Sequence, residues 1–389
     1  MACRPAVIAL ALVGAFGCTA QPARSTGDLP AAASPRARAF EWTLPPGLPV
    51  PRVPDDNPMT GAKVQLGRQL FYDRRLSGTG TFACATCHQQ RRAFTDGLAH
   101  AIGSTGEEHH RSTMSLTNVA YNASYGWSDP SLQTLESQTA VPMFNEHPIE
   151  MGLRRHERAV IVRFAGNAQD VARFRAAFPE DPDPVTLPNI VKAIAAFERT
   201  LVSGDSPFDR YLYLDDRAAM PASARRGMDL FFSERLRCAE CHASFNLSGP
   251  VTFEGRGTIA PVFHHTGLYD VDGRGGYPAV DRGLFDKTQR PTDVGRFRAP
   301  TLRNIAVTAP YMHDGSVPTL GAAVAHYARG GRPSPLRSER VRGFTLSDDE
   351  AADLVAFLES LTDDSFLTNP AFADPAAPQP GGERARASN

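Results

Sequence analysis

Apolar residues recur at helical spacing in two segments of the chain. In the segment 188–201 they stand on one face of a helix, at Ile190, Val191, Ile194 and Phe197. The sequence Ser347-Asp-Asp-Glu350 is a capping box, in which the two outer side chains bond each other's backbone N–H groups. It opens a second helix, whose apolar residues are Leu354, Val355, Phe357, Leu358 and Leu361. We expect both stripes to pack in a core.

The order of apolar and polar residues repeats once along the chain. The segment 67–72 (GRQLFY) is matched by 227–232 (GMDLFF), and each is typical of a helix end that leads into a loop. Farther on, 115–120 (SLTNVA) is matched by 301–306 (TLRNIA). The sequence therefore predicts a mainly α fold of two similar units related by internal duplication. Its 32 glycines and 32 prolines predict long loops, such as residues 245–298.

The N-terminus has the features of an export signal. Arg4 is followed by an apolar run over 6–16 and by a small residue, Gly17. This run is too short to cross a bilayer, for which roughly 20 residues are needed. We expect residues 1–17 to be a signal peptide and the protein to be exported to the periplasm or to the cell-envelope membrane. Cys18 is either a lipid-anchor site or part of a plain cleavage site, and the sequence leaves both open.

Two segments have compositions that do not favour a packed core. Residues 18–40 are rich in Ala, Pro, Ser and Arg and predict a flexible tether, and residues 371–389 predict a disordered tail. The remainder is long enough for two domains, which we place at 41–205 and 206–370. The 41 basic and 42 acidic residues give no charge bias, so we expect neither a nucleic acid nor a membrane surface as a partner.

Two copies of the C-x-x-C-H pattern stand in matching places in the two units. They are Cys84-Ala-Thr-Cys87-His88 and Cys238-Ala-Glu-Cys241-His242. In this pattern the cysteines attach a haem covalently and the histidine binds its iron. The other two of the six cysteines are Cys3 and Cys18. A four-thiolate zinc site would use the same thiols but leaves both histidines unexplained. We therefore expect two c-type haems, one in each domain.

The motifs and the segments around them resemble the bacterial di-haem cytochrome c peroxidase family, which includes MauG. The resemblance covers about residues 55–365 and rests also on the segments 299–304 (APTLRN) and 309–316 (APYMHDGS). It implies two cytochrome c-like domains. It also implies that one haem reacts with hydrogen peroxide and the other relays electrons. The ligands on the far side of each iron then decide which reaction is favoured.

At the first haem, the resemblance implies an open iron. Peroxidases of the family carry a distal histidine in a stretch that corresponds to 96–104 (DGLAHAIGS), and here Ser104 stands in its place. An iron without that ligand can bind peroxide without prior reduction. The nearby histidines that could substitute are His100, His109 and His110.

The resemblance also implies an acid–base group above the first haem. Gln138, Pro142 and Glu150 correspond to the family's glutamine, proline and distal glutamate. Peroxide cleavage requires a group that takes a proton from one oxygen and returns it to the other, as a carboxylate can. Because this stretch contains an apparent two-residue insertion, Glu146 is the alternative to Glu150.

At the second haem, the resemblance implies a tyrosine ligand. Where many members carry methionine, this chain has Tyr327, as in MauG-like enzymes, and an anionic phenolate stabilises oxidised iron. Met312 and His326 are competing ligands. Trp127 corresponds to a tryptophan between the haems that can carry an electron hole. Three oxygen donors, from Asn118, Thr308 and Pro310, correspond to the family's calcium site.

These residues favour one function over two others. The first is a MauG-like enzyme that uses hydrogen peroxide to reach a high-valent di-haem state and then oxidises a partner protein, with tryptophan as the residue modified. Residues 141–150 (VPMFNEHPIE) resemble the branch that includes the di-haem enzyme of methanobactin gene clusters. The second is a cytochrome c peroxidase supplied by a small redox protein. The third is an electron-transfer cytochrome without catalysis, which an open first iron disfavours.

Overall fold

A computed structural model describes residues 40–377, so the predicted signal peptide, Cys18 and nearly all of the predicted tether lie outside the described residues. The helices are α1 (Gly61–Tyr72), α2 (Cys84–Cys87), α3 (Leu135–Phe144), α4 (Glu157–Ala165), α5 (Ala168–Ala177), α6 (Leu187–Glu198), α7 (Pro207–Tyr213), α8 (Ala222–Phe231), α9 (Phe285–Thr288), α10 (Leu320–Ala328), α11 (Asp348–Glu359) and α12 (Asp364–Thr368). The expected mainly α fold is confirmed. None of the helices described is long and apolar enough to cross a membrane.

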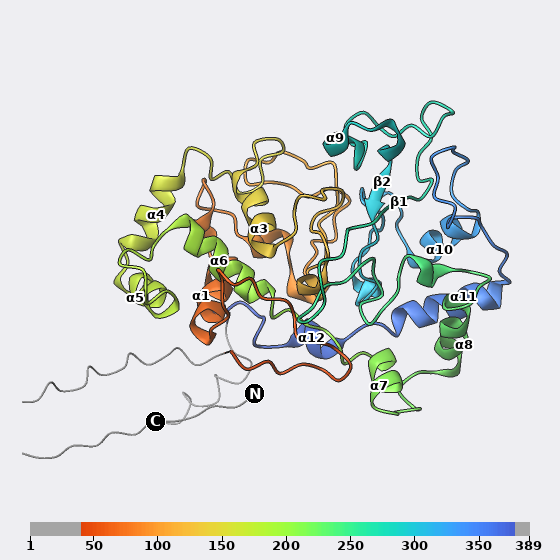
Figure 1. The fold of residues 1–389 in the computed structure, drawn as a ribbon, viewed down its shortest axis with the longest axis horizontal. Coiled ribbons are helices and arrows are strands. Elements are labelled where there is room, and N and C mark those ends of the chain that lie inside the picture. The colour runs from red at the N-terminus through yellow and green to blue at the C-terminus, as the bar shows by residue number, and fades with distance from the viewer. Residues whose placement is uncertain (1–39, 378–389) are drawn as a thin grey trace, which may run out of the picture. The chain divides into compact units, whose positions relative to one another are not determined.

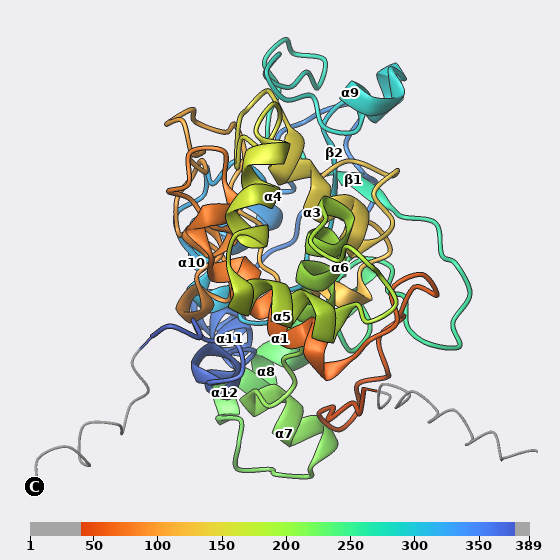
Figure 2. The same cartoon turned by 90° about the vertical axis from the view of Figure 1, so that its left-hand side faces the viewer.

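The helices gather around two separate apolar cores. The first core contains residues of α1, α3, α5 and α6, and the second contains residues of α7, α8, α10 and α11. Figure 1 shows the two groups of helices on opposite sides of the view, with α12 between them. Figure 2 brings α1, α5 and α6 of the first group to the front. The two predicted stripes are confirmed as core, because Ile190 and Phe197 lie in the first and Leu354 and Phe357 in the second.

One pair of crossed helices lies in each core, and a glycine lies at each crossing. A side chain at Gly67 of α1 would meet the carbonyl oxygen of Ala193 in α6 at 1.8 Å. A side chain at Gly227 of α8 would meet that of Asp353 in α11 at 1.9 Å. Both helix pairs therefore approach until backbone touches backbone, and only glycine fits at the contact.

Two asparagines join the halves of the chain at matched positions. The N–H groups of Asn118 and Asn304 donate to the carbonyls of Leu201 and Leu361, which follow α6 and α11, at 2.9 Å each. Their Oδ1 atoms accept from the N–H groups of Ser203 and Asp363, at 2.7 Å each. Both asparagines have left-handed backbone, with φ of 54° and 60°. Asn304 also donates to the Ser203 hydroxyl, which links the two sets of bonds.

The end of the chain differs from the prediction. Residues 371–377, placed in a disordered tail, are described, and Phe372 packs in the first core together with Phe366 of α12. Arg68 of α1 donates to the carbonyls of Pro370 and Ala373. The composition of this segment predicted disorder because it has few apolar residues. One aromatic residue, Phe372, and the bonds from Arg68 are enough to hold it against the first core. The predicted second domain therefore ends on the first core.

The long loop over 245–298 contains structure that the sequence pattern did not indicate. Strands β1 (Phe263–His265) and β2 (Arg296–Arg298) form an antiparallel pair in which Phe263 lies opposite Arg298. Short strands of three residues give too few alternating positions for a periodic signal. The pair positions Phe297 and Arg298 next to the second C-x-x-C-H motif.

The glycine crossing predicts a matched pair of outcomes. Gly67→Ala should destabilise the protein by about 1–3 kcal/mol, because α1 and α6 must separate to admit the methyl group. Gly61→Ala, in the first turn of the same helix, should lie within about 1 kcal/mol of the parent, since nothing is within 4 Å of its added carbon. Thermal unfolding of the purified variants checks both. Equal midpoints for the two variants would show that the crossing tolerates a side chain.

Candidate functional site

Each C-x-x-C-H motif presents its histidine in the orientation that an iron ligand needs. The Nδ1 atom of His88 donates to the carbonyl of Phe94 at 2.8 Å, and that of His242 donates to the carbonyl of Leu247 at 3.2 Å. Such a bond fixes the ring and assigns the other nitrogen, Nε2, to the metal. Burial lowers the pKa of both imidazoles, which favours the neutral form that binds iron. Both motifs therefore fit a haem.

The zinc alternative is not supported. Within residues 40–377, no three side chains of His, Cys, Asp and Glu come together as a metal-binding group, so the two cysteine pairs do not meet. The four cysteines form no disulfide. Burial raises the pKa of Cys87 and of Cys238 to about 12. A closed zinc site would need four converging ligands.

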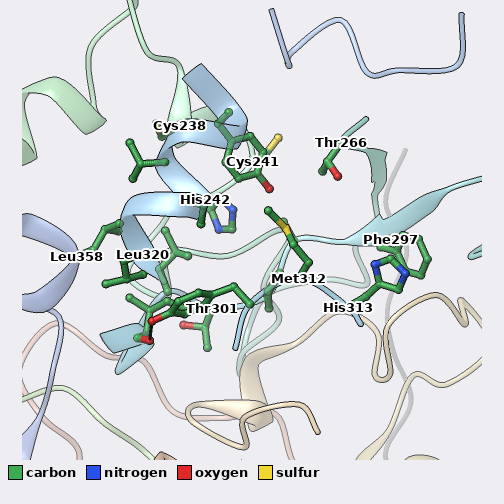
Figure 3. Close-up of a pocket in the computed structure, with 18 of the residues that line it drawn as sticks. Cys238, Cys241, His242, Thr266, Phe297, Thr301, Met312, His313, Leu320 and Leu358 are labelled. Atoms are coloured by element: carbon green, nitrogen blue, oxygen red, sulfur yellow. Dashed lines mark hydrogen bonds between the residues drawn. The ribbon is translucent and has the colours of Figure 1, made fainter. Parts of the chain in front are cut away.

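A cavity of about 510 Å³ lies beside the second motif. Cys238, Cys241 and His242 form part of its wall, and the loop after them supplies Phe297 and Arg298. Figure 3 shows Met312 extending toward His242, with His313 and Phe297 farther along the wall. Its apolar lining includes Leu320, Val324 and Leu358. This is the kind of surface that a haem covers.

Of the three ligands predicted for the second iron, two line this cavity. Tyr327 of α10 does so, and burial raises the pKa of its hydroxyl, with further contributions from Cys241 and Cys238. Met312 lines it as well and stays an alternative. His326 instead turns its Nε2 atom to the carbonyl of Thr266 at 3.1 Å, which argues against it as a ligand.

The candidate acid Glu150 and Ser104, at the position predicted for a distal ligand, lie side by side near the first motif. The N–H of Ser104 donates to the carbonyl of Glu150 at 2.7 Å. The hydroxyl of Ser104 and Oε1 of Gln138 are buried and, among the described residues, form no hydrogen bond. Buried polar atoms of this kind normally have a partner, so a site for a small polar ligand fits here.

Helix α3 holds the segment that carries Glu150. Pro142 lies within this helix, and its carbonyl accepts from the N–H of Met151 at 2.9 Å. The next carbonyl, of Met143, accepts from Leu153 at 2.9 Å. Proline has no backbone N–H to donate within the helix. The carbonyls at the end of α3 accept instead from the segment that follows Glu150, which holds this segment against the helix. Glu150 is thereby fixed between α3 and Ser104.

The two candidate carboxylates have different surroundings. Burial raises the pKa of Glu150 to about 7. Glu146 is exposed and pairs with Arg154 at 3.3 Å. An acid–base group that works near neutral pH needs a pKa in that range, so the surroundings favour Glu150.

The three nearby histidines are occupied or face elsewhere. His100 pairs with Glu108 at 2.8 Å on the surface. His109 accepts from the N–H of Arg111 at 3.0 Å, and its ring lies 4.8 Å from that of His110. The structure gives no sign that any of them takes the place of the missing ligand.

Trp127 lies at the wall of the cavity beside the second motif. Its indole N–H donates to the carbonyl of Ser112 at 3.1 Å, and its ring centre is 6.5 Å from that of His313. The carbonyl of Trp127 accepts from the N–H of Arg298. Trp127 therefore contacts both the segment that follows the first motif, through Ser112, and the strand β2 at the cavity beside the second motif, through Arg298.

The three residues of the predicted calcium site lie on two different segments. Asn118 is fully buried, and both ends of its carboxamide bond the backbone of Ser203. An amide oxygen has two lone pairs, so Oδ1 of Asn118 keeps one for a further partner. Thr308 and Pro310 line the cavity beside the second motif. A calcium site at these three residues stays a prediction.

One buried acid was not predicted from the sequence. Glu198 of α6 is 8% exposed, burial raises its pKa to about 8, and it accepts from the hydroxyl of Thr139 at 3.5 Å. Charges on Glu198 and Glu150 both add to a raised pKa of Cys84 that is mainly due to burial, so both acids lie near the first motif. The spacing Ile190, Ile194, Glu198 could have revealed it, since every fourth residue of this helix faces the core.

Comparisons with known proteins agree with this geometry. A family model described as di-haem cytochrome c peroxidase matches residues 61–217, and one described as RoxA-like, cytochrome c-like, matches 296–330. A cytochrome-c peroxidase of Denitromonas iodatirespirans, IdrP1, is 36% identical over 87% of this chain and 91% of its own. The methylamine utilization protein MauG of Methylorubrum extorquens is 34% identical over 92% and 94%.

A solved structure is similar throughout. The crystal structure of a MauG-like protein associated with microbial copper homeostasis has a TM-score of 0.84 and 45% identity, and the match covers 87% of this chain and 99% of that one. The fold and the two motifs define a haem-dependent peroxidase-type oxidoreductase with two c-type haems. The chain belongs to the di-haem cytochrome c peroxidase and MauG family.

The surroundings of Glu150 predict a pH profile. With its pKa at about 7, the carboxylate form that accepts a proton from peroxide gains as pH rises through neutrality. The rate of reaction with hydrogen peroxide should therefore rise with a midpoint near this pKa. Glu150→Gln should lower the rate by about 10²–10⁴-fold and flatten the profile. Stopped-flow spectroscopy measures both.

Glu146→Gln is the matched control and should keep the parent rate and profile. The opposite result, with Glu146→Gln slow and Glu150→Gln unaffected, would transfer the acid–base role to Glu146.

Proposed function

We propose that this protein uses hydrogen peroxide to oxidise a partner protein, with tryptophan side chains as the residues modified. The observation that carries the proposal is Ser104, which lies next to Glu150. The family resemblance assigns to its position an imidazole that would block the first iron. The haem supplies the reaction with peroxide when bound. Glu150 holds and returns the proton, and Gln138 contributes a buried amide oxygen that has no hydrogen-bond partner among the described residues.

The second site supports the same function. Tyr327 lines the cavity beside His242, and an anionic oxygen ligand favours oxidised over reduced iron. An iron of this kind accepts an electron from a small cytochrome less readily. Trp127, at the cavity wall, is the residue through which we propose that the two sites exchange oxidising equivalents. The relative described as MauG-like shares this fold at 45% identity.

The alternative is a cytochrome c peroxidase supplied by a small redox protein. Relatives of similar identity carry that name. Met312 favours it, because a thioether ligand in the cavity beside His242 would raise the potential of the second haem and help it accept electrons.

We also propose that the two halves, 41–205 and 206–370, are haem units that arose by duplication. Three features recur in each half: a glycine where two helices cross, a histidine bonded through Nδ1 to a carbonyl, and a left-handed asparagine bonded to the segment that follows the second helix of the crossing, α6 or α11. The predicted signal peptide supports export, with Cys18 as the proposed position of a lipid anchor.

A peroxide titration of the fully oxidised protein separates the two functions. As isolated, the protein should show one high-spin and one low-spin ferric haem. One equivalent of hydrogen peroxide, with no reductant, should then give an oxidised species that persists for minutes. Ser104→His, which restores an imidazole, should make the first haem low-spin and remove this reaction. A parent protein that stays inert until half-reduced, and then turns over with a reduced cytochrome, is the outcome expected of the alternative.

The ligand of the second iron has its own test. Tyr327→Met should raise the midpoint potential of the second haem and shorten the life of the oxidised species, because a neutral thioether replaces an anionic oxygen. Met312→Leu is the matched variant and should leave the absorption spectrum unchanged. An altered spectrum in Met312→Leu with a parent-like Tyr327→Met would assign the ligand to Met312.

A further inference from the structure

The cavity beside the second motif has in its wall a buried arginine whose hydrogen-bond partners are all neutral. Arg298, the last residue of β2, is 9% exposed and lines the cavity. Its Nε atom donates to the carbonyl of Gly126 at 3.2 Å, and one Nη donates to Oδ1 of Asn122 at 3.2 Å. The other Nη lies 3.9 Å from the sulfur of Met114. None of these groups carries a charge.

Arg298 differs in this from the other buried arginines of the described chain. Arg199 pairs with Glu136 at 2.8 Å, and Arg303 pairs with Asp209 at 2.7 Å. Within residues 40–377, no aspartate or glutamate forms an ion pair with Arg298. Burial lowers the pKa of its guanidinium to about 10. A charge taken out of water costs several kcal/mol unless an opposite charge meets it, so an anion is expected here.

The residues around Arg298 indicate which anion this is. Ala299 and Pro300 follow it directly and line the same cavity as His242 and Cys241. A haem attached there has two propionate carboxylates, which are the only anionic groups of its periphery. A guanidinium binds a carboxylate through two parallel N–H bonds.

We propose that Arg298 binds a propionate carboxylate of the haem attached at Cys238 and Cys241. The proposal depends on haem attachment at this motif and not on which reaction the enzyme performs. Other arginines at the cavity wall are less suited. Arg235 and Arg237 already pair with Glu350 and Glu240, and both Arg340 and Arg342 are exposed.

The test is the potential of the second haem. A positive charge nearby favours the reduced iron, which carries one positive charge fewer. In Arg298→Met, one of the two midpoint potentials should fall by the equivalent of at least a tenfold change in the ferric–ferrous ratio, about 59 mV for one electron. It should also become pH-dependent near neutrality, because a propionate without its cation takes up a proton. Arg298→Lys keeps the charge and should lie between this variant and the parent.

Arg296→Met is the matched control, since Arg296 lies in the same strand, is 39% exposed and bonds only the carbonyl of Thr292 and Asp293. Both potentials should stay at the parent values in this variant. Spectroelectrochemistry on protein shown to retain both haems gives the readout. Parent potentials and an unchanged pH profile in Arg298→Met would overturn the proposal, since a merely structural arginine predicts that result.

A measurement on the parent protein covers the case in which Arg298→Met does not fold. Redox-difference infrared spectra, with the propionates isotopically labelled, should show at least one propionate that stays ionised where an ordinary carboxyl group titrates. Two propionates that both take up protons in that range would contradict a guanidinium bound to either.

Discussion

The arrangement of both sites depends on one buried set of hydrogen bonds, formed by Asn118, Ser203, Asn304 and Asp363. All four are 0–2% exposed. The Asp363 carboxylate accepts from the Ser203 hydroxyl and from the N–H groups of Gly204 and Asp205. A network this deep, with its members bonded to one another, has little freedom to shift. Each asparagine lies in the chain after a haem motif, so the network ties the segment that follows the first motif to the segment that follows the second.

The ionisable groups near the two motifs differ: acids lie near the first and a guanidinium near the second. Two acids lie near the first, the partly buried Glu150 and the buried Glu198, and their raised pKa values lie near neutrality. The second is faced by a guanidinium, Arg298, and by the phenol of Tyr327. The first motif thus has nearby groups whose pKa values suit proton exchange, and the second has a cation at the wall of the cavity that a haem would fill. The glycine crossing and the bonded asparagine recur in each half, whereas these charged groups do not.

The sequence predicted the parts of the molecule whose chemistry is local. The apolar stripe around Ile194, the capping box at Ser347 and the two haem motifs each depend on residues close together in the chain. It could not show the distant partner of a side chain, as for Asn118, whose oxygen accepts from the N–H of Ser203, 85 residues later. Arg298 escaped notice for the same reason, because a missing partner is visible only when every neighbour is known. The strand pair that carries it is too short for periodicity to reveal.

The return of the chain end to the first core affects how the protein can be made. Phe366 and Phe372 complete a core whose other residues all lie before position 202, and Gln90, two residues after His88, bonds the carbonyls of Phe366 and Asn369. The first core therefore lacks two of its buried aromatic residues until about 160 residues beyond Leu201 have been made. Until then Gln90 also lacks the two carbonyls that hold the segment after the first motif. The order of synthesis thus makes the core that forms from the start of the chain one of the last to be completed.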